Sequence, residues 1–177
     1  IIVEVEKEEQ ELIIYSGRSE SLVGPIIEEF SLLTGIPVAV KYGKTGAMVS
    51  LLLEEGSKTP ADVFYAQDPG GLGAVESMLA PMSREVCNLI PEWAVAPKES
   101  DNSCKWIGIT GRARVLVYNP EVLSADELPT SMEDLTDSKW KGKLGWAPSN
   151  GSFQAMITGM RINWGEEKTK SWLEGIM

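Results

Sequence analysis

The stretch that decides the fold is ELIIYSGRSESLVGPIIEEF, residues 11–30. Its apolar run at 12–16 has the length and composition of a buried strand, and a Ser-Gly break follows it. A helix can begin at Ser19 or Ser21 and end at Gly35. Apolar residues recur on one face of this helix: Leu22, Ile26, Phe30 and Leu33. The stretch therefore predicts a strand that leads directly into an amphipathic helix.

The same alternation continues along the first half of the chain. The segment IPVAVKY at 36–42 predicts a second strand, and the next helix runs from about Thr45 to Gly56. The segment ADVFYA at 61–66 predicts a third strand. A strand–helix–strand–helix–strand order is typical of an α/β fold with a mainly parallel sheet. Ligands of such sheets bind at the carboxyl ends of the strands, where Arg18 and Gln67 stand.

The pattern changes after Trp106. The segment WIGITGRARVLVYNP, residues 106–120, is rich in strand formers, and Arg112 and Arg114 at alternate positions would share one face of a strand. The segment LGWAPSNGSFQAMITGM, residues 144–160, repeats the opening pattern with a strand at 144–147, a small polar turn and a helix. A last amphipathic helix follows in WGEEKTKSWLEGIM.

Composition excludes several classes of function. The chain has 177 residues, a formal net charge of −10, and 26 acidic against 16 basic residues, which argues against nucleic acid as a partner. It has no histidine, so Ser-His-Asp and Cys-His catalysis and His-ligated metal sites are excluded within this chain. Its two cysteines, Cys87 and Cys104, either form a disulfide in an exported protein or stay unpaired in a cytosolic one, and the turn-rich segment between them favours the disulfide.

Two turns between a predicted strand and a predicted helix attract attention as binding sites. Each has an ordinary interpretation, because Ser19 in the first and the segment Ser149, Asn150, Gly151 and Ser152 in the second are common helix caps. Together the two turns indicate an anion-binding site, because both would direct helix N-terminal amides towards a ligand and such amides favour an anion. Arg18, Arg112 and Arg114 could add charge-assisted hydrogen bonds to such an anion.

Four segments follow one another along the chain: LIIYSGRSESLVGPIIEEF, LLLEEGSKTPADVFYAQD, GITGRARVLVYNPEVL and WKGKLGWAPSNGSFQAMI. In this order they resemble the periplasmic ferric-ion-binding proteins of ABC-type iron importers. It implies a type II periplasmic binding-protein architecture of two α/β lobes joined by hinge strands, with the second lobe incomplete in this chain. The expected parts are an N-terminal tail at 1–10, the first α/β lobe at 11–111, and a hinge strand with the start of the second lobe at 112–177.

The resemblance also assigns roles to residues. Arg18 matches an arginine that faces the anion in one branch of the family, and Ser19 stands where another branch has a histidine ligand. Ser149, Asn150, Gly151 and Ser152 match the anion-holding turn. Gln67 stands where some members have a glutamate ligand, so it is a candidate metal ligand, while the characteristic paired tyrosines are expected beyond Met177. Tyr15, Tyr42, Tyr65 and Tyr118 are assigned to packing.

The function implied by the resemblance is a non-catalytic receptor that binds ferric iron, Fe(3+), with carbonate or phosphate as a synergistic anion. We expect such a receptor to be a monomer in the periplasm or outside the cell, with a lipid anchor as one option, and to deliver its ion to an ABC permease in the inner membrane. Two alternatives remain: a receptor of the same fold for a small organic or oxoanion ligand, such as a phosphonate or polyamine, and an α/β enzyme.

Overall fold

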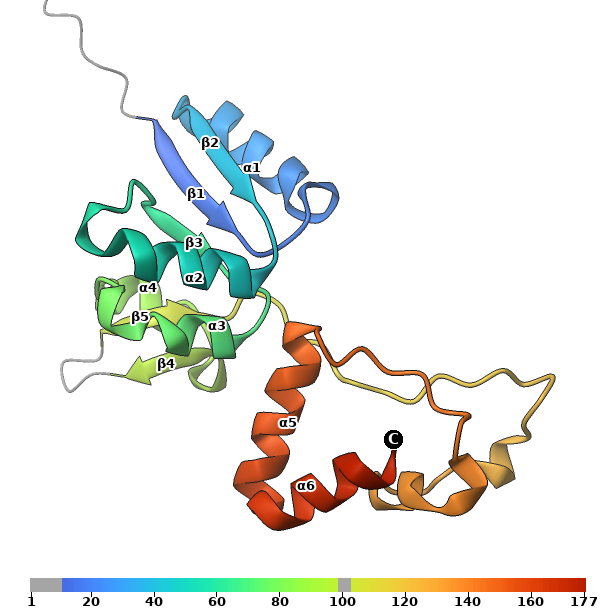
Figure 1. Ribbon diagram of the computed structural model, residues 1–177. Helices are drawn as coiled ribbons and strands as arrows, with labels where there is room; N and C mark the ends of the chain where they lie inside the picture. The colour runs from blue at the N-terminus through green and yellow to red at the C-terminus, as the bar shows by residue number, and fades with distance from the viewer. Residues whose placement is uncertain (1–10, 99–102) are drawn as a thin grey trace, which may run out of the picture. The chain divides into compact units, whose positions relative to one another are not determined.

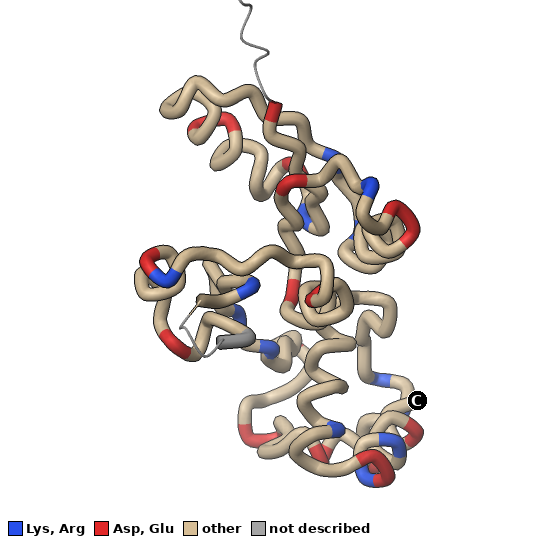
Figure 2. Tube along the Cα trace, turned by 90° about the vertical axis from the view of Figure 1, so that its left-hand side faces the viewer, with Lys and Arg blue, Asp and Glu red and all other residues tan. Residues whose placement is uncertain are grey.

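The computed structural model describes residues 11–98 and 103–177, and the chain divides into two compact units, Ile1–Ile109 and Thr110–Met177 (Figure 1). The tail expected at 1–10 lies outside the described residues. No helix in the described ranges combines the length and apolarity needed to cross a membrane. Acidic and basic residues are interspersed along the trace rather than separated into blocks (Figure 2).

A three-stranded parallel sheet forms the centre of the first unit. Strand β1 (Leu12–Ser16) lies between β2 (Val38–Tyr42) and β3 (Val63–Tyr65), in the order β2-β1-β3. The predicted β-α-β-α-β order of the first half is therefore confirmed. Both pairings are parallel, so all three strands end at the same edge of the sheet.

The helices α1 (Glu20–Thr34) and α2 (Thr45–Glu55) begin and end where the sequence indicates. Gly35 ends α1 with a φ of 71°, in the left-handed region that glycine adopts without strain. Its N–H donates to the Ser31 carbonyl. The apolar residues that share one face of α1 are exposed in this unit: Leu22, Ile26, Phe30 and Leu33. The helix buries Val23 and Gly24 instead, since it is apolar on two faces and only one of them packs in this unit.

The core of the first unit gathers around one aromatic side chain. Tyr15, Met48, Leu52 and Val75 are buried together, with Phe64 and its neighbours packed against them. The Tyr15 hydroxyl, 2.9 Å from Glu55 Oε1, donates to that carboxylate, which also accepts from the Thr59 hydroxyl at 2.7 Å. Short helices complete this region: η1 (Gly56–Lys58), α3 (Pro69–Ala74) and η2 (Glu76–Met78).

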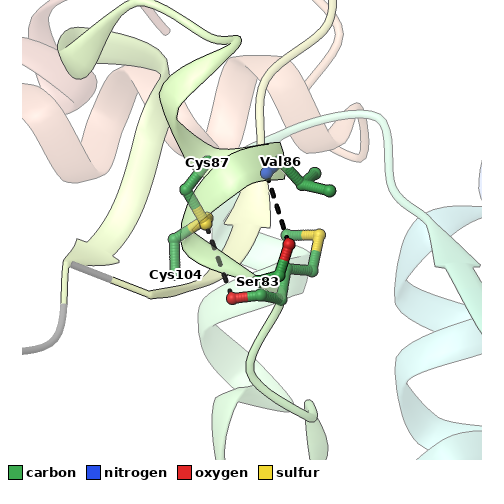
Figure 3. The surroundings of a disulfide bond; sticks show 5 residues. Ser83, Val86, Cys87 and Cys104 are labelled. Atoms are coloured by element: carbon green, nitrogen blue, oxygen red, sulfur yellow. Dashed lines mark hydrogen bonds between the residues drawn. A yellow bond between two sulfur atoms is a disulfide. The ribbon is translucent and has the colours of Figure 1, made fainter. Parts of the chain in front are cut away.

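A disulfide joins the last elements of the first unit. Helix α4 (Arg84–Asn88), capped by the Ser83 hydroxyl, precedes η3 (Glu92–Ala94) and the antiparallel strands β4 (Val95–Lys98) and β5 (Cys104–Ile107). Cys87 of α4 is bonded to Cys104 of β5, with a Cα–Cα distance of 6.0 Å (Figure 3). Both cysteines are buried. The disulfide that the sequence favours is therefore present, in the interior of this unit.

The second unit is built from helices. Three short ones, η4 (Ala125–Glu127), η5 (Glu133–Thr136) and η6 (Ser138–Trp140), precede α5 (Gly151–Trp164) and α6 (Glu166–Gly175). Leu135, Met160 and Trp172 form its buried centre. The indole N–H of Trp172 donates to the Met132 carbonyl at 2.5 Å, which fixes α6 against the start of η5.

Two predicted strands are absent from the structure. The hinge strand expected at the start of 112–177 and the strand expected at 144–147 both lack strand geometry, and Val115 and Val117 in the first of them are 69% and 90% exposed. A strand persists only when a neighbour accepts its backbone hydrogen bonds, and no described segment pairs with either run. These runs have strand composition without a strand partner.

The disulfide should stabilise the first unit measurably. It closes a loop with a sequence separation of 17 residues, for which the loss of chain entropy in the unfolded state predicts about 3 kcal/mol. The double variant Cys87→Ala/Cys104→Ala should therefore lower the free energy of unfolding by about this amount in urea denaturation. A reductant should lower the free energy of unfolding of the parent chain towards that of the variant, and it should leave the value for the variant unchanged. An equal effect of reductant on both would contradict this assignment.

Candidate functional site

The turn between β1 and α1 is held by backbone and hydroxyl groups. Ser16 is fully buried, and its hydroxyl both accepts from Arg18 N–H at 3.1 Å and donates to Arg18 C=O at 3.0 Å. The buried Ser16 hydroxyl therefore closes the turn. Ser19 is the N-cap of α1 without a side-chain cap bond, and its hydroxyl lies 3.2 Å from that of Ser21.

Arg18 is the charged group of this turn. It is half-buried, and within residues 11–98 and 103–177 its guanidinium makes no hydrogen bond or ion pair. A half-buried guanidinium without a carboxylate partner favours binding of an anion from solution. Arg18 therefore stays a candidate for anion binding, while Ser16 holds the backbone of the turn.

Thr45, which the sequence did not single out, connects the carboxyl ends of two strands. Its Oγ1 lies 3.5 Å from Gly17 O, to which it donates, and it accepts from Gln67 N–H at 3.2 Å. A Cβ at position 17 would lie 2.3 Å from Thr45 Oγ1 and 2.9 Å from Thr45 Cα, so only glycine allows this approach. The turn after β1 and the segment after β3 thus share one buried hydroxyl.

Gln67 and Asp68 follow β3 at this edge. Asp68 caps α3, and its Oδ1 accepts from Gly70 N–H at 3.1 Å, whereas its Oδ2 is buried without a hydrogen bond. Among the residues that the structure describes, no group of three or more histidine, cysteine, aspartate or glutamate side chains could hold a metal ion. No such group therefore accompanies Gln67 in these ranges.

The second unit brings the other predicted residues together at the N-terminus of α5. Asn150 is the N-cap, with its Oδ1 accepting from Phe153 N–H at 3.1 Å and from Arg114 Nη2 at 3.5 Å. Arg112 Nη2 donates to Ser152 Oγ at 3.3 Å. Both arginines thus reach the first turn of α5, although the strand that was expected to place them on one face is absent.

Aromatic packing sets the orientation of this turn. Phe153 is buried, its ring centroid lies 5.2 Å from that of Trp146, and the guanidinium carbon of Arg114 lies 5.8 Å from the Phe153 centroid. A guanidinium over an aromatic face loses rotational freedom without losing its charge. Arg114 is therefore positioned by Phe153 and Asn150 together, a role that only the side-chain packing reveals.

This arrangement can bind an anion. The helix α5 is 14 residues long, so its N-terminal amides carry a partial positive charge, and two guanidinium groups lie at the same end. Ser149 lies in the turn directly before Asn150. A tetrahedral or planar oxoanion would find positive charge and hydrogen-bond donors at this turn.

Tyr15 and Tyr42 are poor metal ligands. Burial, together with the hydrogen bond to Glu55 and its charge, raises the pKa of the Tyr15 phenol above the ordinary value of 10.0. Burial and the charges of Glu20 and Glu28 raise the pKa of Tyr42 in the same way. A phenol must lose its proton to bind Fe(III) strongly, so both environments favour a structural role.

The Tyr15 phenol should make stability pH-dependent at high pH. Because its folded pKa lies above the unfolded one, its contribution is complete below pH of about 10 and is lost as the pH rises through the folded pKa. The variant Tyr15→Phe should therefore lose less free energy of unfolding between pH 8 and pH 11 than the parent does. Urea denaturation at both pH values measures this. Parallel losses in the two proteins would show that Tyr15 does not titrate in this way.

The chain matches one family of known proteins and several of its relatives in sequence. The family model for bacterial extracellular solute-binding proteins matches residues 58–177. A protein of Serratia marcescens named Fe(3+)-binding periplasmic protein is 33% identical over 170 residues, covering 95% of this chain and 49% of the relative. Iron uptake protein A1 of Synechocystis is 31% identical over 180 residues, covering 99% of this chain and 48% of the relative.

Solved structures give the same result. Iron-bound HitA from Pseudomonas aeruginosa superposes with a TM-score of 0.85 at 33% identity, over 94% of this chain and 53% of that one. A ferric binding protein from Campylobacter jejuni gives 0.79 at 27% identity, over 93% and 52%. The type II periplasmic binding-protein fold expected from the sequence is thereby confirmed, and the chain spans about half the length of the proteins it matches. Because the family model covers more than half of it, the chain belongs to the bacterial extracellular solute-binding proteins.

Proposed function

We propose that this chain is part of an extracytoplasmic receptor that binds ferric iron together with a synergistic anion for an ABC importer. The observation that carries the proposal is the meeting of Arg112, Arg114 and the α5 N-terminus in one turn. The names of the matched proteins refer to ferric iron or iron uptake, which supports iron as the cargo. The proposal concerns a protein of the relatives' length, called the full-length protein below.

The anion has a chemical reason in this chain. Fe(III) is a hard cation that prefers anionic oxygen donors, and the described residues offer no cluster of carboxylates for it. A carbonate or phosphate held by Ser149, Asn150, Gly151 and Ser152, with Arg112 beside them, would supply such oxygens. We propose that Arg18 and Ser19 also bind an anion and that Gln67 is a neutral ligand.

Location and partners follow from the same proposal. A disulfide between Cys87 and Cys104 persists in an oxidising compartment, which supports the periplasm or the cell exterior, with a lipid anchor as one route of retention. An ABC permease in the inner membrane is then the partner that accepts the ion, and the receptor acts as a monomer. The matched relatives are named as binding and uptake proteins, which favours a receptor over an enzyme.

A receptor for an oxoanion alone is the second candidate. The donors at the α5 N-terminus fit an oxoanion whether or not a metal accompanies it. Native mass spectrometry of the full-length protein after mild purification separates the two: retained iron supports the ferric receptor, and a retained organic or oxoanion ligand without iron supports the alternative.

The arginines at α5 should control anion-dependent iron retention. In the full-length protein, Arg112→Ala or Arg114→Ala should weaken iron retention about tenfold, since each removes one charge-assisted hydrogen-bonding group from the anion. Competition against citrate at fixed phosphate measures the retention. The matched control is Arg161→Ala, which removes an exposed arginine near the other end of α5, paired with Glu166. An equal loss in all three variants would mean that net charge, and not the anion turn, governs retention.

Arg18 should show its role in the dependence on anion concentration. If Arg18 binds the anion, Arg18→Ala should weaken iron retention most when phosphate or carbonate is scarce, and excess anion should restore it. Arg84→Ala is the control, because Arg84 is an exposed arginine of the same unit, in the first turn of the short helix α4. Equal retention by Arg18→Ala and the parent at every anion concentration would return Arg18 to an ordinary surface role.

A further inference from the structure

The turn before α5 contains a reactive dipeptide, Asn150-Gly151. Asn150 is the one asparagine of the sequence that a glycine follows, since the others precede leucine, serine, proline or tryptophan. In such a pair the backbone nitrogen of the second residue can attack the side-chain amide carbon of the asparagine, because these two atoms close a five-membered ring. Glycine leaves its backbone nitrogen most accessible, since it has no Cβ. The sequence therefore makes Asn150 the asparagine most open to this reaction.

The Gly151 amide has no hydrogen bond that would hold its proton. Gly151 is the first residue of α5, so its N–H has no acceptor inside the helix, and within residues 11–98 and 103–177 it donates to no other group. The attacking species is the amide nitrogen without its proton, which carries negative charge. The N-terminus of a 14-residue helix stabilises such a charge, and the Arg114 guanidinium lies at the same turn. The position of Gly151 therefore favours loss of its amide proton.

Two donors hold the side-chain carbonyl of Asn150. Its Oδ1 accepts from Phe153 N–H at 3.1 Å and from Arg114 Nη2 at 3.5 Å. Negative charge develops on Oδ1 when a nucleophile adds to the carbonyl carbon, and donors already directed at that oxygen stabilise this state. Arg114 is itself positioned by the Phe153 ring, with its guanidinium carbon 5.8 Å from the centroid. The contacts that cap α5 thus also stabilise the transition state for attack on Asn150.

We propose that Asn150 is a site of spontaneous deamidation, by which the chain changes the charge of its own turn before α5. The Gly151 nitrogen forms a bond to Asn150 Cγ, the bond from Cγ to Nδ2 breaks, and ammonia leaves with the proton from the Gly151 amide. Water then opens the resulting succinimide ring at one of its two carbonyl carbons and gives aspartate or isoaspartate. The half-buried position of Asn150 leaves access for this water. In sum, one water is consumed, one ammonia is released and a neutral amide becomes a carboxylate.

The consequence for ligand binding rests on the proposed function. Aspartate caps a helix as well as asparagine does, so α5 keeps its start after the change. The new carboxylate takes Arg114, already 3.5 Å from Asn150 Oδ1, into an ion pair. Its negative charge also repels a carbonate or phosphate at the same turn. The aspartate form therefore holds the anion, and with it the iron, more weakly than the parent, so deamidation acts as a slow, one-way loss of anion binding.

Peptide mass spectrometry of the full-length protein tests the reaction without reference to iron. In mildly alkaline buffer the peptide with Asn150 should gain about 1 Da and separate into aspartate and isoaspartate forms, whereas peptides with Asn88 or Asn163 should keep their masses. Gly151→Ala should slow the change about tenfold, because its methyl group shields the attacking nitrogen. An Asn150 that stays unchanged in the folded protein would overturn the proposal, and the same protein unfolded in urea excludes a failure of detection.

Arg114→Ala separates the effect of the folded turn from the reactivity of the dipeptide alone. The folded variant should deamidate about tenfold more slowly than the parent, since one donor to Asn150 Oδ1 is removed, while the two proteins unfolded in urea should react at the same rate. Arg161→Ala is the control, because this exposed arginine lies near the other end of α5. Equal rates for folded Arg114→Ala and the folded parent would show that the turn does not assist the reaction.

Asn150→Asp reproduces the aspartate product and tests its consequence. In the full-length protein, competition against citrate at fixed phosphate should show about tenfold weaker iron retention for Asn150→Asp than for the parent. The matched control is Asn163→Asp, which adds the same charge at an exposed position near the other end of α5. Equal retention by Asn150→Asp and the parent would overturn the loss of anion binding. A parent that retains no iron would instead contradict the proposed function, whereas deamidation is decided by the peptide masses alone.

Discussion

The hydroxyl of Thr45 is the contact on which the ligand edge of the first unit depends. It accepts from Gln67 N–H and donates to Gly17 O, so it connects the segment after β3 to the turn after β1. Both segments follow parallel strands and therefore meet at one edge. Because Thr45 is also the first residue of α2, the start of that helix is fixed against the same two segments. Arg18 takes its position from this arrangement, since its backbone is held by buried Ser16 beside Gly17.

Local signals predicted most of the first unit. Short apolar runs, serine caps and Gly35 and Gly56 defined the strands and the ends of α1 and α2, because each signal acts within a few residues. The buried face of α1 was not predictable in this way. The helix is apolar on two sides, and only packing against a particular neighbour determines which side is buried. The strands expected at 112–119 and 144–147 failed for a related reason, because a strand needs a partner that local composition does not supply.

Some features of the candidate site could likewise be predicted from short segments, and others could not. The alternate spacing of Arg112 and Arg114 predicted that they act together, and the polar turn before α5 predicted its cap, so both features could be read from short segments. Two other features depend on residues distant in the sequence: the connecting role of Thr45 and the stacking of Arg114 on Phe153. Such packing is visible only once the chain is folded, since no local pattern marks it.

The charge of the chain explains why its arginines matter. In the proposed receptor, the net charge of −10 on these 177 residues would repel an anion, so the anion would have to be held by contacts at short range. The α5 N-terminus provides such contacts, because guanidinium groups and helix amides act over a few ångströms, where the distant carboxylates are screened. Under the proposed function, an anion bound there would supply negative oxygens to the metal ion, and among the described residues no group of three or more histidine, cysteine, aspartate or glutamate side chains could do so. The anion would then be a ligand of the hard metal ion, which explains why the arginines that hold it matter for the proposed function.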